Sequence, residues 1–313
     1  MHAAQHLVLK LRARAAQLRY LRRERRLAAP TGSTRTLSIL FSPRPLWEAA
    51  VRNGFRGLPH RLSFEDLHTA DLERHDLIVP LSLDDAHFLR QQPAHVRERI
   101  VPLPDASCTE LCHDKPRLNA FLIDAGFAAH VPPMGDDLEP PFVCKPARGE
   151  NSDDCLLVSD SDAQLRLAEA LARPGLFRQA AVPGAVEYAT HFLMREGAIG
   201  RELTVRYHHA RPLYIKGNEA LAAVRTLGRC PAPGTLQAML RAIGYDGLGC
   251  ANYKVAQGRL QLIEINPRMG GSLCDYFFSF LRSLPQAQRT HRAGCTSWTW
   301  LDSIADRNSV GGA

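Results

Sequence analysis

The chain has 313 residues, of which 45% are hydrophobic and 23% are charged, as expected for a globular protein with a substantial core. No apolar run approaches the roughly 20 residues that span a bilayer, and glycine and proline follow no repeat, so a membrane-spanning or fibrous chain is excluded. The formal net charge is +7, and residues 1–27 alone hold eight basic side chains and one glutamate. The remainder is therefore electrically balanced.

The basic segment predicts an amphipathic helix over residues 5–27, with four leucines at mostly helical spacing: Leu7, Leu11, Leu18 and Leu21. Three interpretations stay open. The helix is a solvated element that lies on the body, a surface for an anionic partner or membrane, or an organellar transit peptide, which scarce serine disfavours. A nucleic-acid partner would rest on this segment alone, so we expect none. We assign residues 1–33 to this extension and its linker.

From Thr36 the pattern changes to short apolar strands that alternate with helices, which is typical of a small α/β domain. We assign it to residues 34–106. The predicted strands are Thr36–Phe41, Arg61–Phe64, His75–Leu81 and Ile100–Leu103, and the predicted helices are Pro45–Asn53 and Leu83–Gln92. Neither GxGxxG nor the Walker motif occurs here or elsewhere in the chain.

A second α/β region, rich in strands, follows at residues 107–285, and we expect a loosely ordered tail at 286–313. Its predicted helices are His113–Gly126, a helix capped by Asp160 or Ser161 with Leu165, Ala168 and Leu171 inward, Gly234–Ile243, and the apolar stretch Leu273–Leu284. Its predicted strands are Pro141–Pro146, Cys155–Val158, Leu176–Val182, Glu187–Arg195, Ile199–His208, Pro212–Lys216, Cys250–Val255 and Arg259–Ile265.

Eight cysteines are scattered without a CxxC pair, which predicts reduced thiols in a cytoplasmic protein. Cys108, Cys112 and His113 lie close in sequence, but no second ligand cluster is near them. We therefore expect these thiols to pack in the core rather than to bind a metal.

The segment from Leu260 to Arg268 is the most informative one. Strand alternation places Glu264 and Asn266 on one face, with Arg268 just beyond the strand end. Carboxylate and amide oxygens suit Mg²⁺, and arginine suits phosphate or carboxylate. Asn252, on the preceding strand, faces the same way as Lys254 and could reach the same ion. A solvated polar face on an edge strand explains the spacing equally well.

Two lysines are candidate phosphate ligands. Lys145 lies inside an apolar strand and precedes a polar, glycine-containing loop whose N–H groups could close over phosphates, and Lys115 begins a helix. A lysine in an alternating strand is often simply exposed, so neither residue decides the matter alone. Their order along the chain with the other motifs is the stronger indication.

Lys115, Lys145 with its glycine-containing loop, and the segment from Leu260 to Arg268 follow one another along the chain. In this order they make residues 114–273, approximately, resemble the ATP-grasp superfamily of carboxylate ligases, of the type found in the carbamoyl-phosphate synthase large subunit. The resemblance implies an α/β (α+β) ATP-grasp fold: a small preceding domain and two lobes that clasp ATP, of which the smaller, hinged lobe covers about residues 140–180. It also implies cofactor-binding roles, which fall on these residues: Lys115, Lys145, Gly149, Ser152, Gln179, Ala180, Val182, Glu187 and Lys216.

The same resemblance implies metal ligation of Mg²⁺, or alternatively Mn²⁺, by Glu264, Asn266 and Asn252, and catalytic roles for Arg268 and Lys145. The implied reaction activates a substrate carboxylate as an acylphosphate and joins it to an amine, with release of ADP and phosphate. The family commonly has Asp or Glu where this chain has Asn252. This departure supports the alternative of a nucleotide-binding protein without turnover, and a hydroxyl acceptor would make the protein a kinase.

The substrate cannot be read from the sequence. Arginines at 201, 206 and 225 are candidates to bind a substrate carboxylate, although exposed strand arginine is the default interpretation. We expect small-molecule carboxylate and amine substrates. A homodimer is a further expectation, with the apolar stretch Tyr276–Leu284 as its candidate interface.

Overall fold

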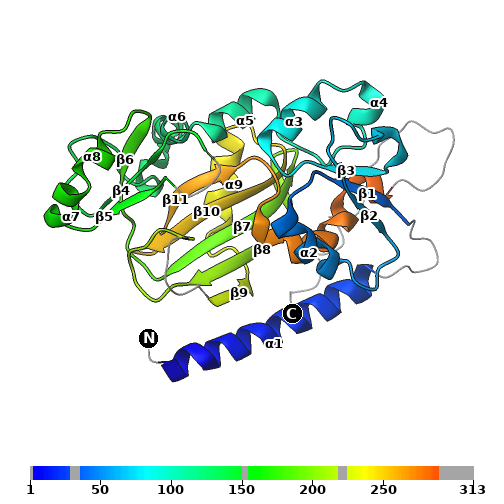
Figure 1. The fold of residues 1–313 in the computed structure, drawn as a ribbon, viewed down its shortest axis with the longest axis horizontal. Helices are drawn as coiled ribbons and strands as arrows, with labels where there is room; N and C mark the ends of the chain where they lie inside the picture. The colour runs from blue at the N-terminus through cyan, green and yellow to red at the C-terminus, as the bar shows by residue number, and fades with distance from the viewer. Residues whose placement is uncertain (1–2, 29–35, 150–153, 218–223, 289–313) are drawn as a thin grey trace, which may run out of the picture.

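The computed structural model describes residues 3–28, 36–149, 154–217 and 224–288. Three β-sheets lie in a row, with a five-stranded sheet between two three-stranded ones (Figure 1). No helix in these ranges combines the length and the hydrophobicity that crossing a bilayer requires. None of the seven cysteines in these ranges forms a disulfide, in agreement with the prediction of reduced thiols.

The first sheet is parallel, in the order β2-β1-β3, and belongs to a small α/β unit. Its predicted strands and helices are confirmed, except that Ile100 makes only an isolated bridge to Ile78 in place of a fourth strand. The elements are β1 (Ser38–Phe41), α2 (Pro45–Gly54), β2 (Arg61–Phe64), η1 (Leu72–Arg74), β3 (Leu77–Val79), α3 (Leu83–Arg90) and α4 (Ala94–Arg97).

The central sheet is antiparallel, in the order β11-β10-β7-β8-β9. Its strands are β7 (Val186–Arg195), β8 (Ala198–His208), β9 (Val224–Gly228), β10 (Gly247–Ala256) and β11 (Arg259–Asn266). The elements near it are α5 (Ala106–His113), α6 (Lys115–Leu122), η2 (Ile123–Phe127), η3 (Ala128–His130) and α9 (Pro233–Ala242). Ala251 and Tyr253 point into the core beneath these helices, so alternation leaves Asn252 and Lys254 on the opposite face.

One predicted strand of this region is wrong. The segment from Pro212 to Lys216 has no strand conformation, and β9 forms the sheet edge instead. The carbonyl oxygen of Pro212 accepts hydrogen bonds from the backbone of Gly184 and from the side chain of Lys254. The segment therefore folds across the sheet rather than pairing with it.

The third sheet, in the order β5-β4-β6, is small and antiparallel. Its strands are β4 (Phe142–Pro146), β5 (Leu156–Val158) and β6 (Leu176–Ala180). The helices α7 (Ser161–Arg166) and α8 (Ala168–Leu171) connect β5 to β6. Asp160 caps α7, as predicted, by accepting from the Ala163 N–H at 2.7 Å. The inward orientation of Leu165 is wrong: its side chain is 76% exposed, because the predicted helix breaks at Leu167 and the helical period does not continue through it.

The last apolar segment is interior. The helical turns η4 (Gly271–Ser283) bury Phe277, Phe278 and Phe280 in the core shared with β1 and α2. The expectation that residues 276–284 form a dimer interface is therefore wrong, because this chain itself covers them. The next helix, α10 (Pro285–Gln288), is anchored where Gln286 donates to the carbonyl oxygens of Glu98 and Ile100, so the tail does not begin at 286. Residues 289–313 lie outside the described ranges.

The N-terminal helix α1 (Ala3–Ala28) lies against β9 and η4, as the interpretation of a helix on the body predicted (Figure 1). Of the four leucines that indicated an amphipathic helix, only Leu21 is buried. The packed face is set instead by Ala13, Tyr20 and Glu24. The Glu24 carboxylate is 2% exposed and accepts from Arg201 at 2.8 Å and from Arg282 at 3.1 Å.

We expect Glu24→Ala to lower the free energy of unfolding by about 2 kcal/mol, because it removes charged hydrogen bonds and leaves two arginines without their shared carboxylate. The matched control is Glu48→Ala, which breaks the exposed Glu48–Arg52 pair and should cost less than about 0.5 kcal/mol. Denaturant unfolding measures both. Equal losses in the two variants would contradict the role of Glu24 in holding α1.

Candidate functional site

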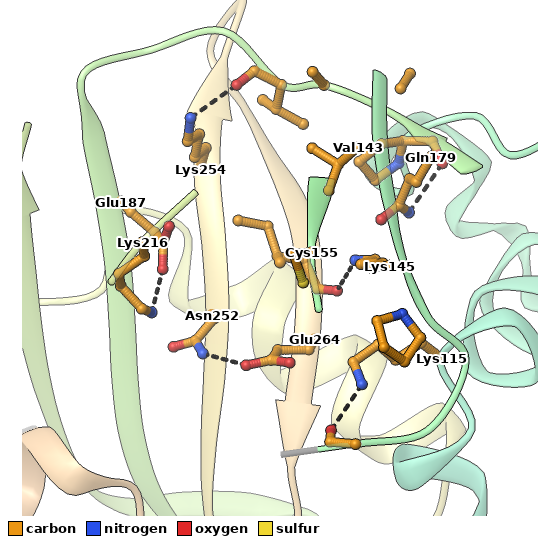
Figure 2. Close-up of a pocket in the computed structure, with 17 residues that line it drawn as sticks. Lys115, Val143, Lys145, Cys155, Gln179, Glu187, Lys216, Asn252, Lys254 and Glu264 are labelled. Atoms are coloured by element: carbon orange, nitrogen blue, oxygen red, sulfur yellow. Dashed lines mark hydrogen bonds and ion pairs between the residues drawn. The ribbon is translucent and has the colours of Figure 1, made fainter. Parts of the chain in front are cut away.

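A cavity of about 130 Å³ lies between the small sheet and the central sheet (Figure 2). Strands β4 and β6 contribute one wall, and β7, β10 and β11 contribute the other. Every predicted cofactor-binding residue in the described ranges lines it. The lining residues that carry polar side chains are Lys115, Lys145, Cys155, Gln179, Glu187, Lys216, Asn252, Lys254 and Glu264.

Strand register explains how the central sheet gathers its polar residues. Asn252 on β10 is the direct cross-strand neighbour of Glu264 on β11, and Lys254 is the neighbour of Glu187 on β7. Because alternate residues share a face, all four side chains project from the same side of the sheet. Figure 2 shows the four side chains spread around the cavity on this side of the central sheet.

Glu264 is held between two asparagines. The Asn252 Nδ2 donates to Glu264 Oε1 at 2.7 Å, and the Asn266 Nδ2 donates to the same oxygen at 3.0 Å. Burial alone would raise the pKa of Glu264, but Lys216 and Lys115 reverse the shift and hold it below its usual value. The side chain is therefore a partly buried carboxylate that stays ionised.

Two lysines reach the cavity from opposite Glu264. Lys145 on β4 is only 6% exposed and donates to the carbonyl oxygen of Ile263 at 3.2 Å. Its sequence pattern did not decide between a buried and an exposed side chain. Burial lowers its pKa to about 8, although Glu264 opposes the shift. Lys115, at the start of α6, donates to the carbonyl oxygen of Gly149 at 2.9 Å. Gly149 has φ +144°, a conformation that favours glycine where this loop begins.

Lys216 and Glu187 form an ion pair in which the glutamate is buried and the lysine is partly exposed. Burial by itself would lower the pKa of Lys216, but Glu187 and Tyr207 raise it above its usual value, so the ammonium is retained. Lys254 is 5% exposed, lies over the Tyr214 ring at 3.9 Å and donates to the carbonyl oxygen of Val182 at 2.9 Å. Lys254 was not predicted as a site residue. It lies two positions after Asn252 on the same strand, so alternation places the two side chains on one face.

Four lysines and two glutamates thus converge on one small cavity, an excess of positive charge that suits a polyanion. No cluster of three or more His, Cys, Asp or Glu residues occurs in the described ranges, so a metal here would depend on a different donor set. Glu264, Asn252 and Asn266 supply one carboxylate and two amide oxygens. These donors fit a single hard cation such as Mg²⁺, which keeps several of its water ligands.

The predicted cofactor-binding residues Gln179, Ala180 and Val182 occupy the other end of the cavity. Gln179 is buried, and its Nε2 donates to the carbonyl oxygen of Pro132 at 3.2 Å. The backbone N–H of Ala180 is already donated to Pro133 at 2.8 Å, so Ala180 has no free N–H for a ligand. Val182 offers a carbonyl oxygen that Lys254 already contacts. Ser152 lies outside the described residues.

A larger cavity of about 560 Å³ adjoins the first and shares Lys216, Asn252 and Glu264 with it. Asn266 and Arg268 line this second cavity, not the first, and Arg268 is 4% exposed with its guanidinium 5.8 Å from the Trp47 ring centre. Glu264 therefore stands at the junction of the two spaces.

The walls of the larger cavity come from elements distant in sequence: Gln17 on α1, Arg44 and Trp47 near α2, Tyr207 and Arg225 on β8 and β9, and Asp275 in η4. Of the three arginines considered as substrate ligands, only Arg225 lies here. Arg201 binds Glu24, and Arg206 lies over the Tyr188 ring. No sequence signal joined Gln17, Arg44 and Trp47 to Arg268.

Solved structures resemble this architecture at low sequence identity. D-alanine–D-alanine ligase from Bacillus anthracis has a TM-score of 0.51 and 13% identity, covering 75% of this chain and 88% of that one. L-Amino acid ligase from Bacillus licheniformis has a TM-score of 0.52 and 15% identity, covering 79% and 70%. Biotin carboxylase from Campylobacter jejuni has a TM-score of 0.51 and 13% identity, covering 82% and 72%.

The chain therefore has the ATP-grasp fold, as the order of its motifs predicted. No protein-family model and no curated protein matches the sequence. At 13 to 15% identity the likeness concerns the fold, and the activity has to be argued from the site.

Proposed function

We propose that this protein is an ATP-dependent ligase that activates a carboxylate and joins it to an amine. The observation that carries the proposal is the position of Glu264, a partly buried, ionised carboxylate at the junction of a lysine-rich cavity and a larger, arginine-containing one. A phosphoryl group that passes from a nucleotide to an acceptor has to cross such a junction.

The small cavity is the proposed nucleotide site. Lys115 and Lys145 contact phosphate beside Gly149. At the far end, Gln179, Ala180 and Val182 bind the adenine, and Glu187, which Lys216 holds in place, meets the ribose. Because the bonds of Ala180 and Val182 described above occupy one group of each, we expect the adenine to use their remaining backbone groups.

Glu264, Asn266 and Asn252 would hold Mg²⁺. When bound, the ion neutralises phosphate charge and acts as a Lewis acid on the phosphoryl oxygens. The protein's own contribution is electrostatic: Lys145 and Arg268 stabilise negative charge that develops on opposite sides of the junction. The γ-phosphoryl passes to a carboxylate oxygen and ADP leaves. An amine then attacks the acyl carbon, a proton is lost from nitrogen, and phosphate is released.

The larger cavity is the proposed acceptor site, and its charges indicate an acidic substrate. Arg44 stacks 4.2 Å from the Trp47 ring centre, and Arg225 lies 5.4 Å from that of Tyr207. Both side chains line the same cavity as Arg268. Together with Arg268 they provide more cations than one reacting carboxylate requires, which favours a substrate with a second acidic group.

We expect Arg44→Gln and Arg225→Gln each to raise the KM for the carboxylate substrate by about tenfold, because each removes one charged contact. The KM for ATP should stay unchanged, since neither side chain lines the nucleotide cavity. Steady-state kinetics with each substrate varied in turn measures the split. Equal increases in both KM values would contradict the assignment of the larger cavity.

The test of the activity is release of ADP and free phosphate from Mg-ATP, with a pooled panel of carboxylates and amines. ADP with stoichiometric phosphate and an amide product supports the ligase. ADP without phosphate, with a stable phosphate ester, would instead identify a kinase.

A second candidate, a nucleotide-binding protein without turnover, is favoured by Asn252, an amide at a position where the family commonly has a carboxylate. Calorimetry would then show nucleotide binding while no substrate mixture releases ADP. The Asn252→Asp variant restores the charge, and turnover gained only in that variant would decide for this candidate.

A further inference from the structure

Helix α1 lies along the outside of the protein, so one of its faces turns away from the body (Figure 1). That face carries exposed leucines. Leu7, Leu11 and Leu18 recur at helical spacing on one side and are 58%, 62% and 46% exposed. Of the nine strongly exposed large hydrophobic side chains in the described ranges, five lie on this helix: Leu7, Val8, Leu11, Leu18 and Leu27. The packing of α1 against the body does not explain them.

The same face is strongly basic. The exposed basic residues of the helix are Lys10, Arg12, Arg14, Arg19, Arg22, Arg23 and Arg26. Four of these arginines, with Leu27, border a shallow hollow of about 360 Å³. Within the described part of the chain, no carboxylate pairs with Arg19, Arg22 or Arg26. The one acidic residue of the helix, Glu24, points inward and is used to hold α1 in place.

We propose that the outer face of α1 docks onto an anionic phospholipid bilayer. The helix is about 39 Å long and would lie parallel to the membrane, with its leucines among the acyl chains and its arginines at the phosphates. Its charge complements a negative lipid surface. This inference stands on α1 alone and does not depend on the proposed ligase activity.

Two other occupants fit the face less well. Nucleic acid would engage the arginines but gives no use to a row of exposed leucines, because its outer surface is phosphate. A second copy of α1 would bury the leucines but would also bring two strongly basic helices together, and like charges at that distance repel. A bilayer satisfies the apolar and the basic side chains together.

The test is co-sedimentation of the full chain with vesicles of phosphatidylcholine, with and without phosphatidylserine. The first variant is Leu7→Ser/Leu11→Ser/Leu18→Ser, and its control is Leu165→Ser, which changes an equally exposed leucine on α7. The second is Arg19→Gln/Arg22→Gln/Arg26→Gln. Its control, Arg97→Gln/Arg117→Gln/Arg259→Gln, removes the same charge from exposed positions on other elements.

We expect the wild type to sediment only with phosphatidylserine vesicles. The arginine variant should bind on the order of a hundredfold more weakly, since each arginine near an anionic surface contributes about fivefold, and the leucine variant about tenfold or more weakly. Both controls should bind as the wild type does. Circular dichroism and thermal unfolding check that α1 remains folded and docked in each variant.

Three results would overturn the proposal: no vesicle binding by the wild type, unchanged binding in the leucine variant, or equal losses in a variant and its control. Tight binding to duplex DNA in fluorescence anisotropy, without vesicle binding, would replace the membrane with nucleic acid. Vesicle binding needs no nucleotide or turnover, so its failure is separate from a failure of the ligase assay.

Discussion

The Glu264→Gln variant is expected to release ADP at least about a thousandfold more slowly than the wild type, while it folds normally. The substitution keeps the shape of the side chain and its acceptor oxygen for Asn252 and Asn266. It removes the negative charge that three lysines face and that the proposed Mg²⁺ requires. Steady-state ADP release under saturating Mg-ATP measures the effect.

Glu187→Gln is the matched comparison, because Glu187 is the other carboxylate that lines the same cavity. Its charge is neutralised by Lys216, and it lies at the proposed ribose end of the site. We expect a raised KM for ATP with kcat reduced far less than in Glu264→Gln. If both variants lose kcat equally, or if Glu264→Gln keeps normal turnover, the junction is not the reaction centre.

Strand alternation predicted which polar side chains of the central sheet share a face. A period of two puts Asn252 and Lys254, or Glu264 and Asn266, on a common face wherever the strand runs regularly. Cross-strand pairing then brings Asn252 opposite Glu264. Alternation alone could not decide whether this face was exposed, and the small sheet that covers it is a tertiary feature. A second lobe over this face was expected only from the resemblance that the order of the motifs indicated.

The acceptor cavity shows the limit of local patterns. Gln17, Arg44 and Asp275 are far apart in sequence and meet only because α1, α2 and η4 pack together around the buried rings of Phe277 and Phe278. None of them belongs to a motif.

The orientation of α1 could not be predicted for a related reason. Hydrophobic periodicity identifies the leucine side of the helix as its apolar face. The face that packs against the body is a different one, because it carries Glu24, whose buried carboxylate binds Arg201 and Arg282. A charge network formed with distant residues therefore determined which face packs, and the leucines were left outside.

Lys145→Met should weaken nucleotide binding by about a hundredfold, because it removes a charged donor to phosphate from a site shielded from water. A pH dependence should accompany this loss. The lysine pKa is lowered to about 8 by burial, so most of the ammonium is present at neutral pH and is lost as the pH rises through that value. Since the charged form binds phosphate, wild-type affinity should fall above pH 8 by up to about tenfold per unit.

Calorimetric titration with ADP on either side of that pH measures the dependence, and Lys216→Met provides the comparison. The pKa of Lys216 is displaced upward by Glu187, so Lys216 does not titrate in this range. Its replacement should weaken binding yet leave the fall above pH 8 in place. The Lys145→Met profile should instead be flat across the same range. A fall that persists in Lys145→Met would assign the titration to another group and remove Lys145 from the phosphate site.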